Sequence, residues 1–135
     1  MTIPEELKPA MQGVYPSQVV TCSPDGIPNI AYVTQVYYCD EDHVALSDQF
    51  FSKTIKNVRA NPLASVLISH PETAASYLLE VEYLRSENEG PFFEEMEMQL
   101  EAVASMTGMS DVYKLRGADI YKVLSITKNQ GDRRT

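Results

Sequence analysis

Residues 46–69 read LSDQFFSKTIKNVRANPLASVLIS, and this stretch changes character twice along its length. It leaves a strand-like segment, runs through a polar loop, and then places the apolar residues Ile55 and Val58 three positions apart. That spacing indicates a short helix opening near Ser52, and Pro62 prevents the helix from continuing. The stretch therefore predicts a strand, a loop, a short helix and a second strand, in this order.

The start of this predicted helix carries the groups that bind a phosphate monoester. A helix start exposes unpaired backbone N–H groups and a positive partial charge. Ser52 and Thr54 add hydroxyl donors and Lys53 adds a full positive charge, with Lys56 and Arg59 further along. The alternative interpretation is that Ser52 is an ordinary N-cap and that the cations lie on a solvated helix face.

The rest of the chain is mainly strand-like. Residues 18–22, 30–39 and 43–46 are three such segments joined by short turns, which predicts an antiparallel meander. With three later strands and helices between them, the whole chain predicts an antiparallel barrel with added helices. The other predicted elements are strands over residues 64–69, 77–85 and 120–126, and helices over residues 4–11 and 91–107.

Composition limits the classes of function. The chain has 135 residues, of which 44% are hydrophobic and 22% charged, and it fits one domain over residues 1–127 with a flexible tail over residues 128–135. Its net charge of −8 argues against nucleic acid or an anionic membrane as a partner. We find neither an apolar run long enough to span a bilayer nor the features of a secretory signal.

The sequence offers few residues with obvious reactive chemistry. Cys22 and Cys39 are far apart and outside any metal-binding spacing, so we expect reduced cysteines and a cytoplasmic location. His43 and His70 are isolated in the sequence, which predicts no metal site. No sequence motif of hydrolases or nucleoside triphosphatases is present, and no residue stands out as a catalytic acid or base.

The order of elements resembles the pyridoxamine 5'-phosphate oxidase-like family of flavin-binding split barrels. That family has a strand ending in a small hydroxyl residue, a Ser followed by basic or polar residues, a short helix, and an Asn-Pro before the next strand. The matching positions are Ser47, residues 52–54 and residues 61–62. The resemblance covers residues 10–126 and implies a six-stranded antiparallel split barrel that binds FMN at the interface of a homodimer.

The resemblance also implies which residues contact the cofactor. The phosphate would lie at the helix start, the ribityl chain beside the end of the preceding strand, and the isoalloxazine ring against residues 32–36. Backbone amides and a side chain such as Thr34 or Gln35 would bond the polar edge of the ring. The implied cofactor-binding residues are Tyr32, Val33, Thr34, Gln35, Val36, Ser47, Asp48, Ser52, Lys53, Thr54 and Ser76.

Departures from the family pattern argue against pyridoxamine phosphate as the substrate. The oxidases proper have basic residues on both sides of the ring-facing strand, where this chain has Tyr32 and Tyr37. They also have a C-terminal segment with Trp and Arg, whereas this chain has no Trp. We therefore expect an FMN-dependent oxidoreductase that acts on another small redox substrate. The alternative is a non-enzymatic carrier or sensor module that binds flavin or haem.

Overall fold

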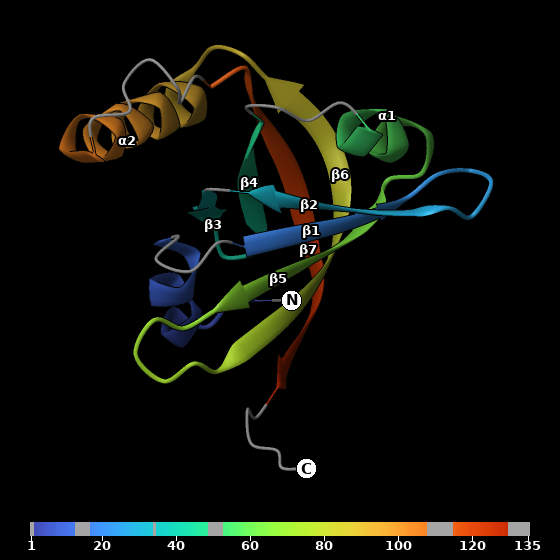
Figure 1. Ribbon diagram of the computed structural model, residues 1–135, viewed down its shortest axis with the longest axis horizontal. Helices are drawn as coiled ribbons and strands as arrows, with labels where there is room; N and C mark the ends of the chain where they lie inside the picture. The colour runs from blue at the N-terminus through green and yellow to red at the C-terminus, as the bar shows by residue number, and fades with distance from the viewer. Residues whose placement is uncertain (1, 13–16, 34, 49–52, 108–114, 130–135) are drawn as a thin grey trace.

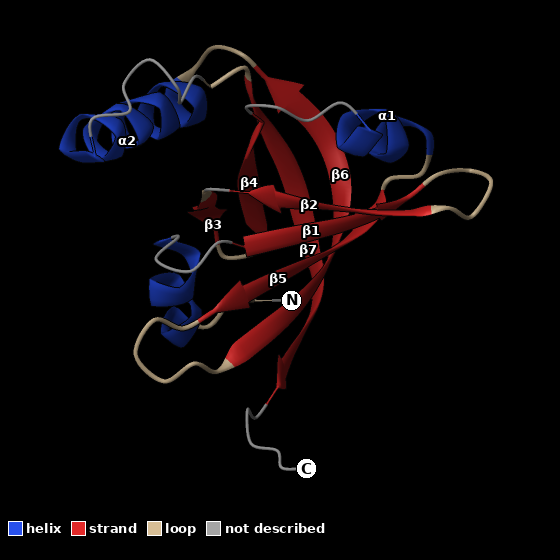
Figure 2. Ribbon diagram, in the orientation of Figure 1, coloured by secondary structure: helices blue, strands red, loops and turns tan. Residues whose placement is uncertain are grey.

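The computed structural model describes residues 2–12, 17–33, 35–48, 53–107 and 115–129. Strands dominate these described ranges, which also contain one 3-10 helix and two α-helices, and Figure 2 shows the helices and strands in separate colours. The elements in chain order are η1 (Glu5–Gln12), β1 (Ser17–Cys22), β2 (Pro28–Val33), β3 (Val36–Asp40), β4 (His43–Asp48), α1 (Lys53–Ala60), β5 (Leu63–Ser69), β6 (Ser76–Glu87), α2 (Pro91–Thr107) and β7 (Gly117–Asn129).

Within the described residues, seven strands form one antiparallel sheet in the order β2-β1-β5-β6-β7-β4-β3. The long strands β6 and β7 curve through the molecule and bend the sheet into a barrel (Figure 1). β2 and β3 are at the two ends of this order, and the described residues form no ladder between them. The barrel is therefore split at that point, which confirms the mainly β, split-barrel fold.

The strand count and the predicted meander are wrong in one place. The strand expected over residues 30–39 is two strands, and the chain changes partners around Gln35. β2 pairs with β1, whereas β3 pairs with β4. Each hairpin has a different outer neighbour, β5 for β1 and β7 for β4, so the two hairpins lie on opposite sides of the split. Among the described residues the sheet consequently has seven strands instead of six.

The barrel interior is an apolar core with a helix at each end. Val19, Leu46 and Leu79 are fully buried in its middle. Leu7 of η1 and Val58 of α1 belong to the same buried cluster. η1 and α1 lie at opposite ends of the barrel, so each helix covers one end of this core (Figure 1).

A second, outer cluster lies between α2 and the β4–β7 part of the sheet. Met96 and Leu100 of α2 pack there with Ala45 of β4 and Ile120 of β7. No helix in the described ranges is long and apolar enough to cross a membrane.

The C-terminal strand is longer than the sequence predicted. β7 continues to Asn129, so Lys128 and Asn129, the first two residues of the predicted tail, pair with β6. Residues 130–135 lie outside the described residues.

Candidate functional site

Two amide side chains fix the position of α1. Asn29 Nδ2 of β2 donates a hydrogen bond to Thr54 Oγ1 (3.3 Å), and Asn57 Nδ2 donates to Thr21 Oγ1 of β1 (3.1 Å). Thr54 and Asn57 are buried, whereas Lys53, the first residue of the helix, is exposed. The helix is therefore held on the β1–β2 hairpin by its inner face and presents its first cation to solvent. Thr54 therefore anchors the helix through its hydroxyl oxygen.

The end of β4, the strand before α1, is hydrogen-bonded to a neighbouring segment on each side. Ser47 N donates to the carbonyl oxygen of Gln35 (3.1 Å), which links β4 to the segment between β2 and β3. Arg116 N donates to the Asp48 carbonyl oxygen (2.8 Å), and Arg116 Nη2 lies 3.0 Å from Asp48 Oδ1. Ser47 and Asp48 are both buried. These bonds fix the point from which residues 49–52, which include the predicted Ser52 and lie outside the described residues, lead to α1.

The predicted ring-facing segment presents very different side chains. Tyr32 is 70% exposed, whereas Val33 and Val36 belong to the barrel core, so only their backbone groups are available to a ligand. Gln35 is half-buried and lies between β2 and β3, while Thr34 lies outside the described residues. The side chains of this segment that can reach a ligand are therefore those of Tyr32 and Gln35 among the described residues.

The Gln35 amide has one satisfied end and one orphaned end. Its Nε2 donates to Gln99 Oε1 of α2 (2.6 Å). Its Oε1 is buried and has no hydrogen-bond partner among the described residues. A buried acceptor without a partner is unfavourable, so a ligand N–H there would satisfy it. This orphaned oxygen fits the polar edge of a flavin, which contains an N–H group between two carbonyls.

Within one chain, Ser76 lies far from Ser47. In the β7 ladders, Ser47 pairs with Ala118 of β7, whereas Ser76 pairs with Asn129. Those two positions are eleven residues apart on β7, which corresponds to about 36 Å of strand. Ser76 thus lies next to Tyr77, whose hydroxyl bonds Glu6 of η1, and it is far along β7 from the position of Ser47.

A buried carboxyl group lies inside the barrel near α1. Asp119 of β7 is 1% exposed and accepts a hydrogen bond from Ser86 Oγ at Oδ1 (2.7 Å). Ser86 Oγ in turn shares a hydrogen bond with the Tyr83 hydroxyl (2.6 Å). Asp119 Oδ2 and the Tyr121 hydroxyl are buried with no partner in the described part of the chain.

Burial controls the protonation of this group. It raises the pKa of Asp119 from 3.8 to about 6, against the hydrogen bond from Ser86. The negative charge of Asp48 raises the pKa further, whereas Arg59 and Arg116 lower it. Burial also raises the pKa of Tyr121. At neutral pH the interior therefore holds a largely ionised carboxylate whose desolvation is only partly compensated.

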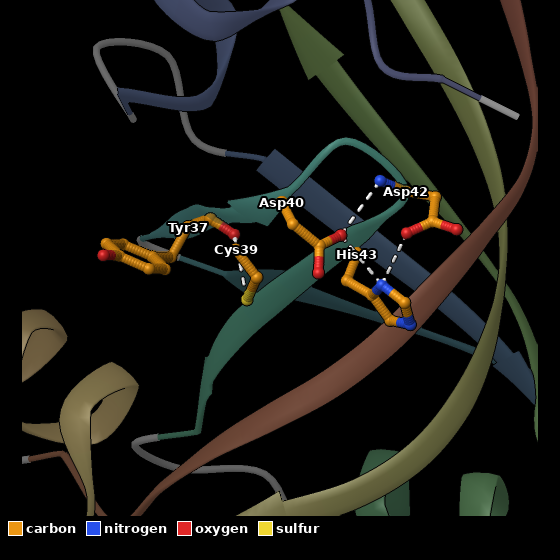
Figure 3. A network of polar contacts seen from close by, with 5 residues as sticks. All are labelled: Tyr37, Cys39, Asp40, Asp42 and His43. Atoms are coloured by element: carbon orange, nitrogen blue, oxygen red, sulfur yellow. Dashed lines mark hydrogen bonds and ion pairs between the residues drawn. The ribbon is translucent and has the colours of Figure 1, made fainter.

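His43 is not isolated in the fold, although it looked so in the sequence. Its Nδ1 lies 2.8 Å from Asp40 Oδ1 and 2.7 Å from Asp42 Oδ1 in the β3–β4 turn (Figure 3). Desolvation opposes ionisation of Asp40, but hydrogen bonds from the Asp42 amide and from His43 outweigh it and lower the Asp40 pKa. These contacts account for the grouping without a metal ion, and the absence of a metal site stays a prediction.

The neighbouring thiol and phenol are poor nucleophiles. Burial, followed by the charges of Asp40 and Glu87, raises the pKa of Cys39 to about 12. Burial and a hydrogen bond to Glu95 raise the pKa of Tyr37 to about 12. Both groups are therefore protonated at neutral pH, and the thiol lacks the thiolate that covalent catalysis requires. Cys22 and Cys39 are both free cysteines.

The structure adds polar residues that the sequence analysis did not single out. Asp119 had a detectable signal, since it is a carboxylate between two apolar residues, but the predicted strand began one residue after it. Asn29, Gln99 and Arg116 carry no such signal, because each lies in a segment where polar residues are ordinary. Their partners are distant in sequence, so only the fold brings them together.

Known proteins match this chain in sequence, as a family model and as one relative. The family model described as pyridoxamine 5'-phosphate oxidase matches residues 3–123. An uncharacterised protein of Methanocaldococcus jannaschii is 30% identical over 76 residues, which are 50% of this chain and 51% of that protein. The match thus spans about half the length of that relative.

Two solved structures are similar over nearly the whole chain. An FMN-binding protein from Syntrophomonas wolfei subsp. wolfei has a TM-score of 0.75 and 15% identity, covering 96% of this chain and 89% of that one. HupZ from Group A Streptococcus has a TM-score of 0.72 and 17% identity, covering 98% of both chains. At these identities the two structures establish the shared fold.

Proposed function

This chain belongs to the pyridoxamine 5'-phosphate oxidase family, and we propose that it binds FMN and uses it for redox chemistry on a small substrate other than pyridoxamine phosphate. The bound flavin would supply the electron or hydride transfer, and the protein would orient it and exclude competing reactions. Among the described residues, those proposed to hold it are Lys53 and Thr54 at the phosphate, Ser47 and Asp48 beside the ribityl chain, and Tyr32, Val33, Gln35 and Val36 at the ring. Thr34, Ser52 and Ser76 complete the proposed set.

The observation that carries this proposal is the placement of Lys53. It is exposed at the first residue of α1, directly after the loop from β4, and Thr54 and Asn57 hold the helix in place. A fixed helix start with an exposed ammonium group is well suited to a phosphate dianion. The orphaned Gln35 oxygen lies on the segment bonded to the end of β4, as a ring beyond the ribityl chain would require.

We also propose a homodimer with FMN at the subunit interface. Ile30 and Tyr32 of β2 are 65% and 70% exposed, and Leu63 of β5 is 56% exposed. The ladders from β2 through β1 to β5 place these three side chains on one outer face of the sheet. Several large apolar side chains exposed on one face are typical of a protein–protein interface. Free cysteines support a cytoplasmic location for this assembly.

Native mass spectrometry of the purified protein, together with its visible spectrum, tests the proposal as a whole. We expect a dimer that carries FMN and shows the absorbance of an oxidised flavin. A haem Soret band would favour the haem-binding carrier. The spectrum of a deazaflavin would show that a deazaflavin is bound in place of FMN. If FMN binds but neither a reduced nicotinamide nor another donor reduces it, the non-enzymatic carrier is favoured. A colourless protein that ignores added FMN contradicts the proposal.

Removing the exposed cation at the helix start should weaken FMN binding. For Lys53→Ala we expect a loss of about 1.5–3 kcal/mol in FMN binding free energy, the range for a hydrogen bond to a charged group. Lys56→Ala is the matched control, since Lys56 is an exposed lysine one turn further along the same helix. Its effect should stay below about 0.5 kcal/mol. Titration of the apoprotein by flavin fluorescence measures both, and equal losses would assign the effect to net charge alone.

A further inference from the structure

Helix α2 lies beside the segment between β2 and β3, which is proposed to face the flavin ring. Gln99 Oε1 of α2 accepts the hydrogen bond from Gln35 Nε2 at 2.6 Å. One turn earlier on the same side of the helix, the Glu95 carboxylate accepts a hydrogen bond from the Tyr37 hydroxyl of β3. Phe92 contacts the ring of the same tyrosine, with 6.1 Å between the ring centroids. The Glu95 carboxylate is therefore held next to the proposed ring-facing segment.

The charged side chains of α2 are all negative. The helix contains Glu94, Glu95, Glu97 and Glu101 and no Lys, Arg or His. Each of these glutamates is exposed. No basic residue in the last turn offsets the negative end of the helix dipole. A charged solute that approaches this side of the molecule therefore meets a negative potential.

The described cations that flank α2 in the chain do not cancel this potential, because each is paired with a carboxylate. Arg85 Nε lies 2.9 Å from Glu87 Oε2, and Arg116 Nη2 lies 3.0 Å from Asp48 Oδ1. The basic helix α1 begins at Lys53, where the negative charge of the FMN phosphate would offset the ammonium group. The end of the site proposed for the ring consequently keeps a negative field.

We propose that the reduced flavin of this protein gives its electrons to a small, positively charged acceptor, and that Glu95 attracts this acceptor towards the ring. This inference rests on the proposed FMN binding. The two electrons of the reduced ring pass to the acceptor, and its two protons pass to the acceptor or to solvent. An attractive field raises the encounter rate of a cation and lowers that of an anion, so the charge of the acceptor decides how fast it reacts.

Two inorganic acceptors of opposite charge test this inference. Hexaammineruthenium(III) is a cation and ferricyanide is an anion. Each ion takes one electron, so one reduced flavin reduces two ions and releases two protons to solvent. The FMN-loaded protein is reduced with dithionite in the absence of oxygen and mixed with either acceptor at low salt. The return of the oxidised flavin absorbance gives the rate constant of electron transfer.

Glu95→Gln removes one negative charge and keeps an acceptor oxygen for the Tyr37 hydroxyl. We expect the rate constant to fall about three- to tenfold with the ruthenium cation and to rise with ferricyanide, and added salt should reduce both effects. Glu72→Gln makes the same chemical change at an exposed residue in the turn between β5 and β6, away from α2 (Figure 1). That control should change either rate constant by less than about 1.5-fold.

Opposite shifts with the two acceptors are the required result. A shift in the same direction with both acceptors would mean that Glu95 acts on the potential or the accessibility of the flavin, which overturns the inference while FMN binding stands. Equal shifts in Glu95→Gln and Glu72→Gln, or no shift in either, overturn it in the same way. Failure of the wild-type protein to bind FMN overturns the proposed function and this inference with it. Glu95 is exposed, so the variant should fold normally, and circular dichroism checks this.

Discussion

Replacing Asp119 with asparagine is expected to raise the free energy of unfolding by about 3 kcal/mol above pH 6 and to leave it unchanged near pH 3. The carboxyl group has a pKa of 3.8 in its ordinary environment and about 6 inside the barrel. Its ionised form is therefore less stable in the folded protein than in the unfolded chain. Stability of the wild-type protein should fall as the pH rises from 3.8 to about 6 and then level off. Asparagine removes that loss and can still accept the hydrogen bond from Ser86.

Urea unfolding at a series of pH values measures this effect. The two unfolding curves should coincide at the acidic end and separate progressively through the window between the two pKa values. Asp25→Asn is the matched control, because Asp25 is exposed in the turn between β1 and β2. That variant should follow the wild-type profile. A constant offset between Asp119→Asn and wild type at all pH values would mean that protonation of Asp119 is not the cause.

Truncating Met96 to alanine should lower the free energy of unfolding by about 2–5 kcal/mol. The side chain is fully buried in the outer cluster between α2 and the sheet, where it packs with Leu100, Ala45 and Ile120. Its removal leaves a cavity at the centre of the contact that holds the helix. Hydrogen exchange of the α2 amides should also accelerate, because the helix depends on this contact more than on its own propensity.

Met98 provides the control for this prediction. It lies two residues further along the same helix and is 67% exposed. Met98→Ala should therefore change the unfolding free energy by no more than about 0.5 kcal/mol. Chemical denaturation of the wild type, Met96→Ala and Met98→Ala under identical conditions measures the three unfolding free energies. Similar losses for both variants would show that methionine truncation weakens the helix itself and not its packing against the sheet.

Local patterns in the sequence predicted much of the fold. The apolar stripe of residues 91–107 gave α2 with both its ends, and the alternation around residues 77–85 gave most of β6. The break at Gln35 could not be predicted in this way, because residues 30–39 have continuous strand propensity. Whether such a run is one strand or two depends on its partners, here β1 and β4, which are set by the whole sheet.

In the candidate site, too, features set by neighbouring residues could be predicted, whereas features set by distant partners could not. The cation at the start of α1 could be read from neighbouring residues, and Lys53 is indeed exposed there. The Gln35–Gln99 contact joins residues 64 positions apart, and Asp119 meets Ser86 across two long strands. Ser76 was placed by resemblance alone, and its register opposite Asn129 of β7 could not be read from local sequence. Its contact with the cofactor stays a prediction.

The split between β2 and β3 has a mechanical consequence. The hairpin of β1 and β2 carries α1, whereas the hairpin of β3 and β4 underlies α2, and no ladder of the described residues joins β2 to β3. Within the described residues, the two hairpins are therefore joined to each other by the chain and by packing, without a shared ladder of hydrogen bonds. A ligand that touches both Lys53 and Gln35 would act as a brace across this joint. Part of its binding free energy would then appear as resistance of the whole barrel to unfolding.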